Sequence, residues 1–196
     1  MQREFIQVGP YTTSRVELKE IAKACIAVAI AFTIYLTSLN IRFLPALAIS
    51  FSGIVLGMVL HEIAHKLVAQ RYGCVAEFRS FPTMLLLGIV LSVFGVVFLA
   101  PGAVFISGPV GRRRNGKISA AGPFTNMILA GIFLLLTNVS NPLVVEIAKY
   151  GAMINAWLAL FNMIPFGPLD GKKVFQWNKL AYGVLLIISI ILLGVV

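Results

Sequence analysis

The chain has 196 residues, of which 59% are hydrophobic and only 12% are charged. Soluble domains average about 45–50% apolar and about 25% charged residues, so this composition excludes an ordinary soluble protein and indicates an integral membrane protein. The net charge of +9 is dispersed between apolar segments and forms no basic face interleaved with aromatic residues, which argues against a nucleic-acid partner. Orientation in the lipid bilayer and attraction to anionic lipid explain the charge better.

Apolar segments long enough to cross a bilayer recur along the chain, because a spanning helix needs about 20 mostly apolar residues. The predicted fold is an all-α polytopic bundle of about five transmembrane helices, and the length leaves room for a single domain over residues 1–196. The five predicted spans are 21–39, 44–68, 118–138, 144–166 and 180–196.

The segment between the second and third spans is apolar but interrupted by proline and glycine. We predict that residues 82–101 are re-entrant, entering the membrane as a helix or loop and returning on the same side. Residues 75–79 and 103–107 flank this insertion and are strand-like, so we expect them to pair as a short β-hairpin at the membrane boundary. An open edge of that hairpin would suit an extended peptide that binds by strand addition.

The re-entrant course also places most of the basic residues on one face of the membrane. Of the 16 lysine and arginine residues, only Arg42 and Lys149 then lie on the opposite face, which leaves 14 (16 − 2) on the first. The positive-inside rule makes the first face cytoplasmic. We therefore expect a multi-pass protein of the cell membrane, with the N-terminus and the active-site end on the cytoplasmic side.

The second predicted span carries the sequence His61-Glu62-Ile63-Ala64-His65. On a helix His61 and His65 lie one turn apart, so both imidazoles can reach one ion, while Glu62 lies beside them and can act on a water molecule. This is the His-Glu-x-x-His arrangement of zinc peptidases. These are the only two histidines of the chain, and ionisable groups inside a membrane helix are costly without a function. The alternative, buried histidines that only bond to neighbouring helices, suits a lone histidine better.

Catalytic zinc usually has three protein ligands, so one more is needed. Asp170 is the main candidate, because it follows a proline- and glycine-rich break that the predicted topology places at the same membrane face as His65. Glu77 lies on the same side and is the alternative ligand. Asp170 could also be part of an ordinary Asp-Gly turn with no role in metal binding. Two imidazoles and a carboxylate suit Zn²⁺, and we predict one ion per chain.

Three motifs in this order resemble the site-2 protease family of intramembrane metallopeptidases. They are His61-Glu62-Ile63-Ala64-His65, Ala121-Gly122-Pro123-Phe124-Thr125-Asn126, and the segment from Asn162 to Asp170-Gly171. The resemblance implies that His61, His65 and Asp170 bind zinc and that Glu62 is the catalytic base. It further implies that Asn162 and Asn126 contact the substrate backbone or the oxyanion, although helix packing explains the second motif equally well.

The expected activity is zinc-dependent hydrolysis of peptide bonds in transmembrane protein substrates, within or beside the bilayer. A divalent-metal transporter is an alternative, but transport needs a polar route through both leaflets, and the acidic and histidine groups cluster near one face. A catalytically silent scaffold that binds membrane helices is a second alternative, usually signalled by loss of the base or of a ligand. Metal flux into sealed vesicles would separate a transporter from a peptidase.

Overall fold

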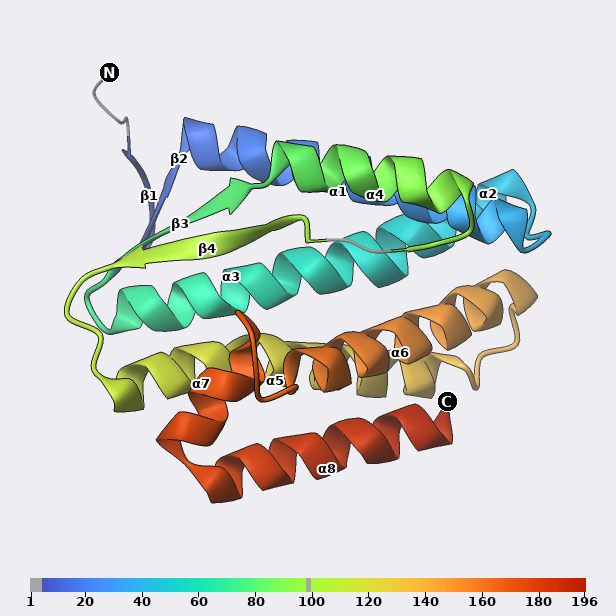
Figure 1. The fold of residues 1–196 in the computed structure, drawn as a ribbon. Helices are drawn as coiled ribbons and strands as arrows, with labels where there is room; N and C mark the ends of the chain where they lie inside the picture. Colours follow the sequence, from blue (N-terminus) through green and yellow to red (C-terminus); the bar gives the residue numbers. More distant parts are fainter. Residues whose placement is uncertain (1–4, 98–99) are drawn as a thin grey trace.

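The computed structural model describes residues 5–97 and 100–196 of the chain, and helices dominate it (Figure 1). The strands are β1 (Phe5–Val8), β2 (Tyr11–Ser14), β3 (Val75–Ser80) and β4 (Gly102–Ser107). The helices are α1 (Arg15–Ser38), α2 (Phe43–Ile49), the π-helix η1 (Ser50–Val55), α3 (Leu56–Arg71), α4 (Pro82–Val93), α5 (Arg112–Leu136), α6 (Pro142–Asn162), α7 (Asp170–Trp177) and α8 (Lys179–Val195).

Four helices within the described ranges are long and apolar enough to cross a membrane. They are α1, the continuous helix Phe43–Arg71 formed by α2, η1 and α3, then α5 and α6. The chain is therefore a multi-pass membrane protein, as expected, but the predicted number of five spans is wrong. The fifth segment does form α8, which is apolar but has only 17 residues. A spanning helix needs about 20 residues.

The predicted hairpin around the insertion is confirmed. Strands β3 and β4 pair antiparallel, from Val75↔Ser107 to Ser80↔Gly102. Beyond the last pair the Phe81 N–H donates to the Pro101 carbonyl at 3.1 Å. The insertion therefore leaves and rejoins the hairpin at the same place, and its helix α4 packs along α1 (Figure 1). The re-entrant course of residues 82–101 relative to a bilayer stays a prediction.

A second hairpin, β1–β2, precedes α1 and had no counterpart in the predicted elements. It ends at Ser14, whose Oγ caps α1 by accepting from the Glu17 N–H at 3.0 Å. The buried Glu17 carboxylate accepts from the Phe78 backbone N–H at 3.0 Å and forms an ion pair with Lys66. These contacts fix the start of α1 against β3 and against the end of α3.

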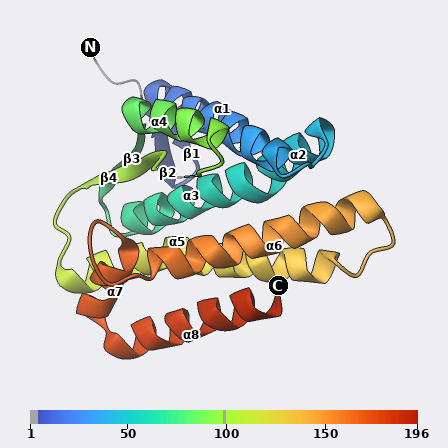
Figure 2. The same cartoon turned by 45° about the vertical axis from the view of Figure 1, so that its right-hand side comes forward.

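Helix α3 lies at the centre of the molecule. On one side are α1, α4 and the β3–β4 hairpin, and on the other are α5 and α6, with α7 beside α5 and α8 outermost (Figures 1 and 2). Helix α5 packs on α3, α6 and α7. Small buried residues on α6, among them Ala148, Ala152, Ala156 and Ala159, allow helices to approach closely without a large apolar core. The His-Glu-x-x-His motif is therefore enclosed by packed helices.

Candidate metal centre

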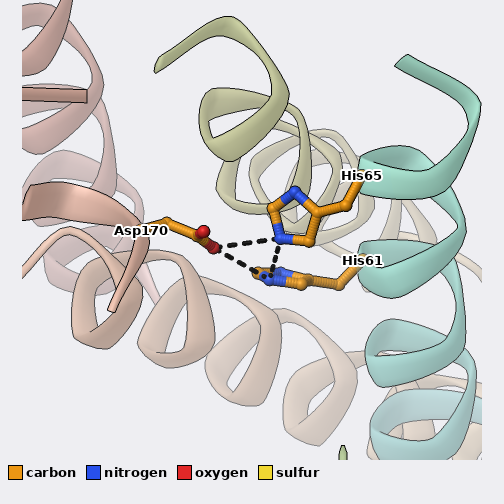
Figure 3. A group of neighbouring side chains, drawn as sticks. All are labelled: His61, His65 and Asp170. Atoms are coloured by element: carbon orange, nitrogen blue, oxygen red, sulfur yellow. Dashed lines mark hydrogen bonds and ion pairs between the residues drawn. The ribbon is translucent and has the colours of Figure 1, made fainter. Parts of the chain in front are cut away.

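Three potential ligands converge between α3 and α7 (Figure 3). The Nε2 atoms of His61 and His65 are 3.0 Å apart, and Asp170 Oδ2 lies 3.3 Å from the first and 3.0 Å from the second. All three residues are buried. Glu77, the alternative third ligand, lies elsewhere: it accepts from Ser14 Oγ at 2.5 Å and pairs with Arg79 at 2.7 Å.

The break after α6 brings Asp170 to this position. Helix α6 ends at Asn162, and Gly167 adopts a left-handed conformation with φ +67° in the loop that follows. Asp170 then begins α7, so the Asp-Gly pair is the first turn of a helix rather than a simple turn. A Cβ on Gly171 would overlap the Met163 carbonyl and lie 2.7 Å from the Ile164 oxygen. Glycine at this position therefore lets α7 approach the end of α6.

The outer nitrogen of each imidazole is held by an acceptor. His65 Nδ1 lies 2.8 Å from the Ile118 carbonyl, which can only accept, so Nδ1 carries the proton. His61 Nδ1 lies 2.5 Å from Asn126 Oδ1. The Asn126 amide nitrogen donates to Asn155 Oδ1 at 2.9 Å, which leaves Oδ1 to accept from His61. Both Nε2 lone pairs are thus turned toward Asp170, as a metal ligand requires.

A positive ion at the centre would stabilise the cluster, because two nitrogen lone pairs and a carboxylate oxygen lie within 3.3 Å of one another. Burial raises the pKa of the Asp170 carboxyl, but the interactions with His65 and His61 lower the pKa more, so its net value lies below the usual range. The carboxylate is therefore available as an anionic ligand. Two imidazole nitrogens and one carboxylate oxygen form a donor set that suits a catalytic zinc ion and leaves a fourth position open.

Gly122 of α5 supplies the space for this arrangement. A Cβ at this position would lie 2.5 Å from Nε2 of both His61 and His65, closer than any side chain can pack. The second sequence motif therefore contributes to the metal centre through its glycine, whereas sequence reasoning weighed substrate contact by Asn126 equally against helix packing. The signal was the Gly-Pro pair inside an apolar span, where both residues are costly in a helix.

Curated relatives of the chain are zinc metalloproteases. The putative zinc metalloprotease MJ0611 of Methanocaldococcus jannaschii is 39% identical over 175 residues, which cover 87% of this chain and 89% of the relative. The chain belongs to the site-2 protease family of zinc metalloproteases. The resemblance inferred from the three motifs is thereby confirmed.

More distant relatives agree with this assignment. The putative zinc metalloprotease Rip3 of Mycobacterium tuberculosis is 32% identical over 62% of this chain, which spans only 29% of Rip3. The putative zinc metalloprotease YwhC of Bacillus subtilis is 27% identical over 63% of this chain and 65% of its own length. No family model and no solved structure matches the chain.

In this site-2 protease, Glu62 lines a small cavity against α3. The cavity has a volume of about 10 Å³, roughly the space that one water molecule occupies. Met58, Phe78 and Val104 form part of its wall, so it lies between α3 and the β3–β4 hairpin. Glu62 thus borders this cavity and lies outside the set of three converging ligands.

The edge of β4 opposite β3 pairs with no other strand of the described residues, and it lies beside Glu62. In the Phe78↔Val104 pair the Phe78 N–H bonds to Glu17 and not to Val104, so the pair is of the non-hydrogen-bonded kind. The N–H and C=O of Val104 consequently point away from β3, and Val104 lines the same cavity as Glu62. Within the described residues, the protease therefore presents a strand edge that pairs with no third strand beside the predicted catalytic base.

The two asparagines predicted to contact substrate lie in different surroundings. Asn126 is fully buried, and its amide bonds to His61, to Asn155 and, at 3.3 Å, to the Gly57 carbonyl. This placement turns Asn126 toward a histidine and leaves none of its surface for a substrate. Asn162 is half-buried at the end of α6 and donates to the Leu158 carbonyl at 2.9 Å, so its substrate or oxyanion role stays a prediction.

Proposed function

We propose that this protein hydrolyses peptide bonds of membrane-spanning protein substrates at a zinc ion held by His61, His65 and Asp170. Family membership gives the class of activity: the protein is a zinc-dependent metalloprotease, and it is a multi-pass membrane protein. The observation that carries the proposed site is the convergence of three buried ligand atoms from α3 and α7 around one point. The bonds from both Nδ1 atoms support the same assignment, since they leave Nε2 as the binding nitrogen.

The chemistry divides between the ion and the side chains. Zinc supplies a Lewis acid that makes water nucleophilic near neutral pH. Glu62 accepts a proton from the attacking water, whose oxygen bonds to the peptide carbonyl carbon. Glu62 then delivers that proton to the amide nitrogen as the C–N bond breaks. Asn162 lies at the end of the helix that leads to Asp170 and is proposed to donate a hydrogen bond to the oxyanion.

The open edge of β4 is the proposed place for the substrate. A transmembrane helix hides its amide bonds in its own hydrogen-bond ladder, so the cleaved segment must first unwind. An unwound segment can add to β4 as a third strand and use the outward N–H and C=O of Val104. This position brings the scissile bond close to Glu62, because Glu62 and Val104 line one cavity.

The proposed placement in the membrane makes the chain one intramembrane protease domain over residues 1–196. Its cytoplasmic face carries the N-terminus, the β-hairpins and the active site, and it holds 14 of the 16 basic residues. Helix α4 is proposed to dip into the bilayer from this face as a re-entrant segment. Its exposed side chains, which include Leu86, Val90 and Val93, are apolar and suit contact with lipid.

The test is cleavage by purified protein in liposomes, with a set of reporter proteins whose single membrane helix contains glycine or proline. We expect the wild type to cleave at least one reporter and the Glu62→Gln variant to cleave none while it keeps its zinc. Residual turnover by Glu62→Gln would reject Glu62 as the base. A wild type that moves zinc into sealed vesicles and cleaves nothing would favour the transporter.

A further inference from the structure

A buried asparagine that no motif includes is connected to the metal centre by hydrogen bonds. Asn155 lies on α6 and is completely buried, with a relative exposure of 0%. Its side-chain nitrogen donates to the backbone carbonyls of Gly53 at 3.0 Å and Gly151 at 2.8 Å. Its oxygen accepts from Asn126 at 2.9 Å, and Asn126 in turn accepts from His61.

The chain of bonds has only one possible direction. Backbone carbonyls cannot donate, so the nitrogen of Asn155 must face Gly53 and Gly151, and its oxygen must face Asn126. The nitrogen of Asn126 must then face Asn155, and its oxygen must face His61. The only arrangement consistent with every bond places a proton on His61 Nδ1 and leaves Nε2 free to bind a metal.

The surrounding backbone is shaped for this amide. A Cβ on Gly57 would overlap the Asn155 oxygen and lie 3.2 Å from its nitrogen. A Cβ on Gly53 would lie 3.1 Å from Gly151 Cα, so glycines on both helices permit the approach. Gly53 belongs to the π-helix η1, an irregularity that is rare and often accompanies functional sites. Glycines at positions 53 and 57 therefore form a small-residue pair that receives a polar side chain.

We infer that Asn155 is a positioning residue that, acting through Asn126, sets the tautomer and the orientation of His61 for metal binding. The inference rests on the proposed zinc site. It assigns to α6 a role in the metal centre besides that of carrying the loop to Asp170. Groups that orient a ligating histidine commonly change metal affinity by about 10–100-fold when they are removed.

The experiment measures zinc affinity of the full-length protein in detergent by competition with a chelator of known affinity. We expect Asn155→Ala to bind zinc about 10–100-fold more weakly than the wild type. Ser50→Ala is the matched control, because Ser50 is also fully buried in a membrane helix and bonds to Thr33 (3.2 Å), away from the metal centre. The control should bind zinc as the wild type does.

A spectroscopic readout separates positioning from a general loss of stability. With ¹⁵N-labelled histidine only two side chains give signals. Asn155→Ala should shift the Nδ1–H signal of His61 and leave that of His65, which bonds to the Ile118 carbonyl, unchanged. Asn126→Ala, which removes the acceptor itself, identifies the His61 signal.

A second variant covers the case in which Asn155→Ala does not fold. Gly57→Ala keeps the asparagine but pushes on its amide oxygen, so it should weaken zinc binding and shift the same histidine signal. Unchanged zinc affinity and an unchanged His61 signal in a folded variant would overturn the inference, as would equal losses in Ser50→Ala. A wild type that binds no zinc would instead reject the proposed function.

Discussion

Adding a single methyl group at Gly122 should destroy the metal centre while every ligand residue is kept. In Gly122→Ala the new Cβ would lie 2.5 Å from both Nε2 atoms, and real Cβ atoms essentially never come within 3.0 Å of another group. Each ring nitrogen must therefore retreat by at least 0.5 Å (3.0 − 2.5) or the helices must separate. Zinc sites tolerate deviations of about 0.2 Å in ligand distance, so the displacement exceeds the tolerance more than twofold.

The assay is zinc content of the purified variant by elemental analysis, together with cleavage of a membrane reporter. We expect loss of stoichiometric zinc and of cleavage, with a further cost in stability of about 1–3 kcal/mol from overpacking. Gly131→Ala is the matched control in the same helix, because a Cβ there meets nothing within 4 Å. Wild-type zinc content in Gly122→Ala would refute the reasoning, since the ligands cannot keep their positions around an inserted methyl group.

Two further predictions concern the surroundings of the centre. Glu17→Ala leaves the buried Lys66 without its partner and should lower the free energy of unfolding by about 3–5 kcal/mol, measured by denaturant titration in detergent. Equal stability of variant and wild type would show that the pair is not a structural anchor. Val104→Pro removes the N–H at the open edge of β4 and should abolish cleavage while zinc stays bound, whereas Val104→Ala keeps both. Normal cleavage by the proline variant would reject strand addition at this edge.

Local periodicity explains what the sequence predicted well. The spacing of His61 and His65 places both on one helix face wherever that helix lies, so their proximity follows from helical geometry alone. The pairing of residues 75–79 with 103–107 also follows from local strand character, and the structure extends each strand by one residue, to Ser80 and from Gly102.

The polar contacts between helices were harder to predict because they depend on how each helix is rotated. When a helix is apolar on all sides, its sequence pattern does not indicate which face points toward the neighbouring helices. Asn126 was therefore assigned to substrate, although the structure turns it toward His61, and Asn155 was missed. A buried amide in a membrane helix was the available signal for both. The fifth span was overcounted because apolar composition continues through α8, whereas its helical length is short.

Zinc content of the wild type beside Asp170→Ala tests the central claim most directly. Asp170 is 109 residues from His61 in the sequence (170 − 61), and only the fold brings the two side chains to 3.3 Å. The account predicts one zinc per wild-type chain and little or none in the variant, with both proteins equally helical. Full zinc occupancy in Asp170→Ala would contradict the proposed ligand set.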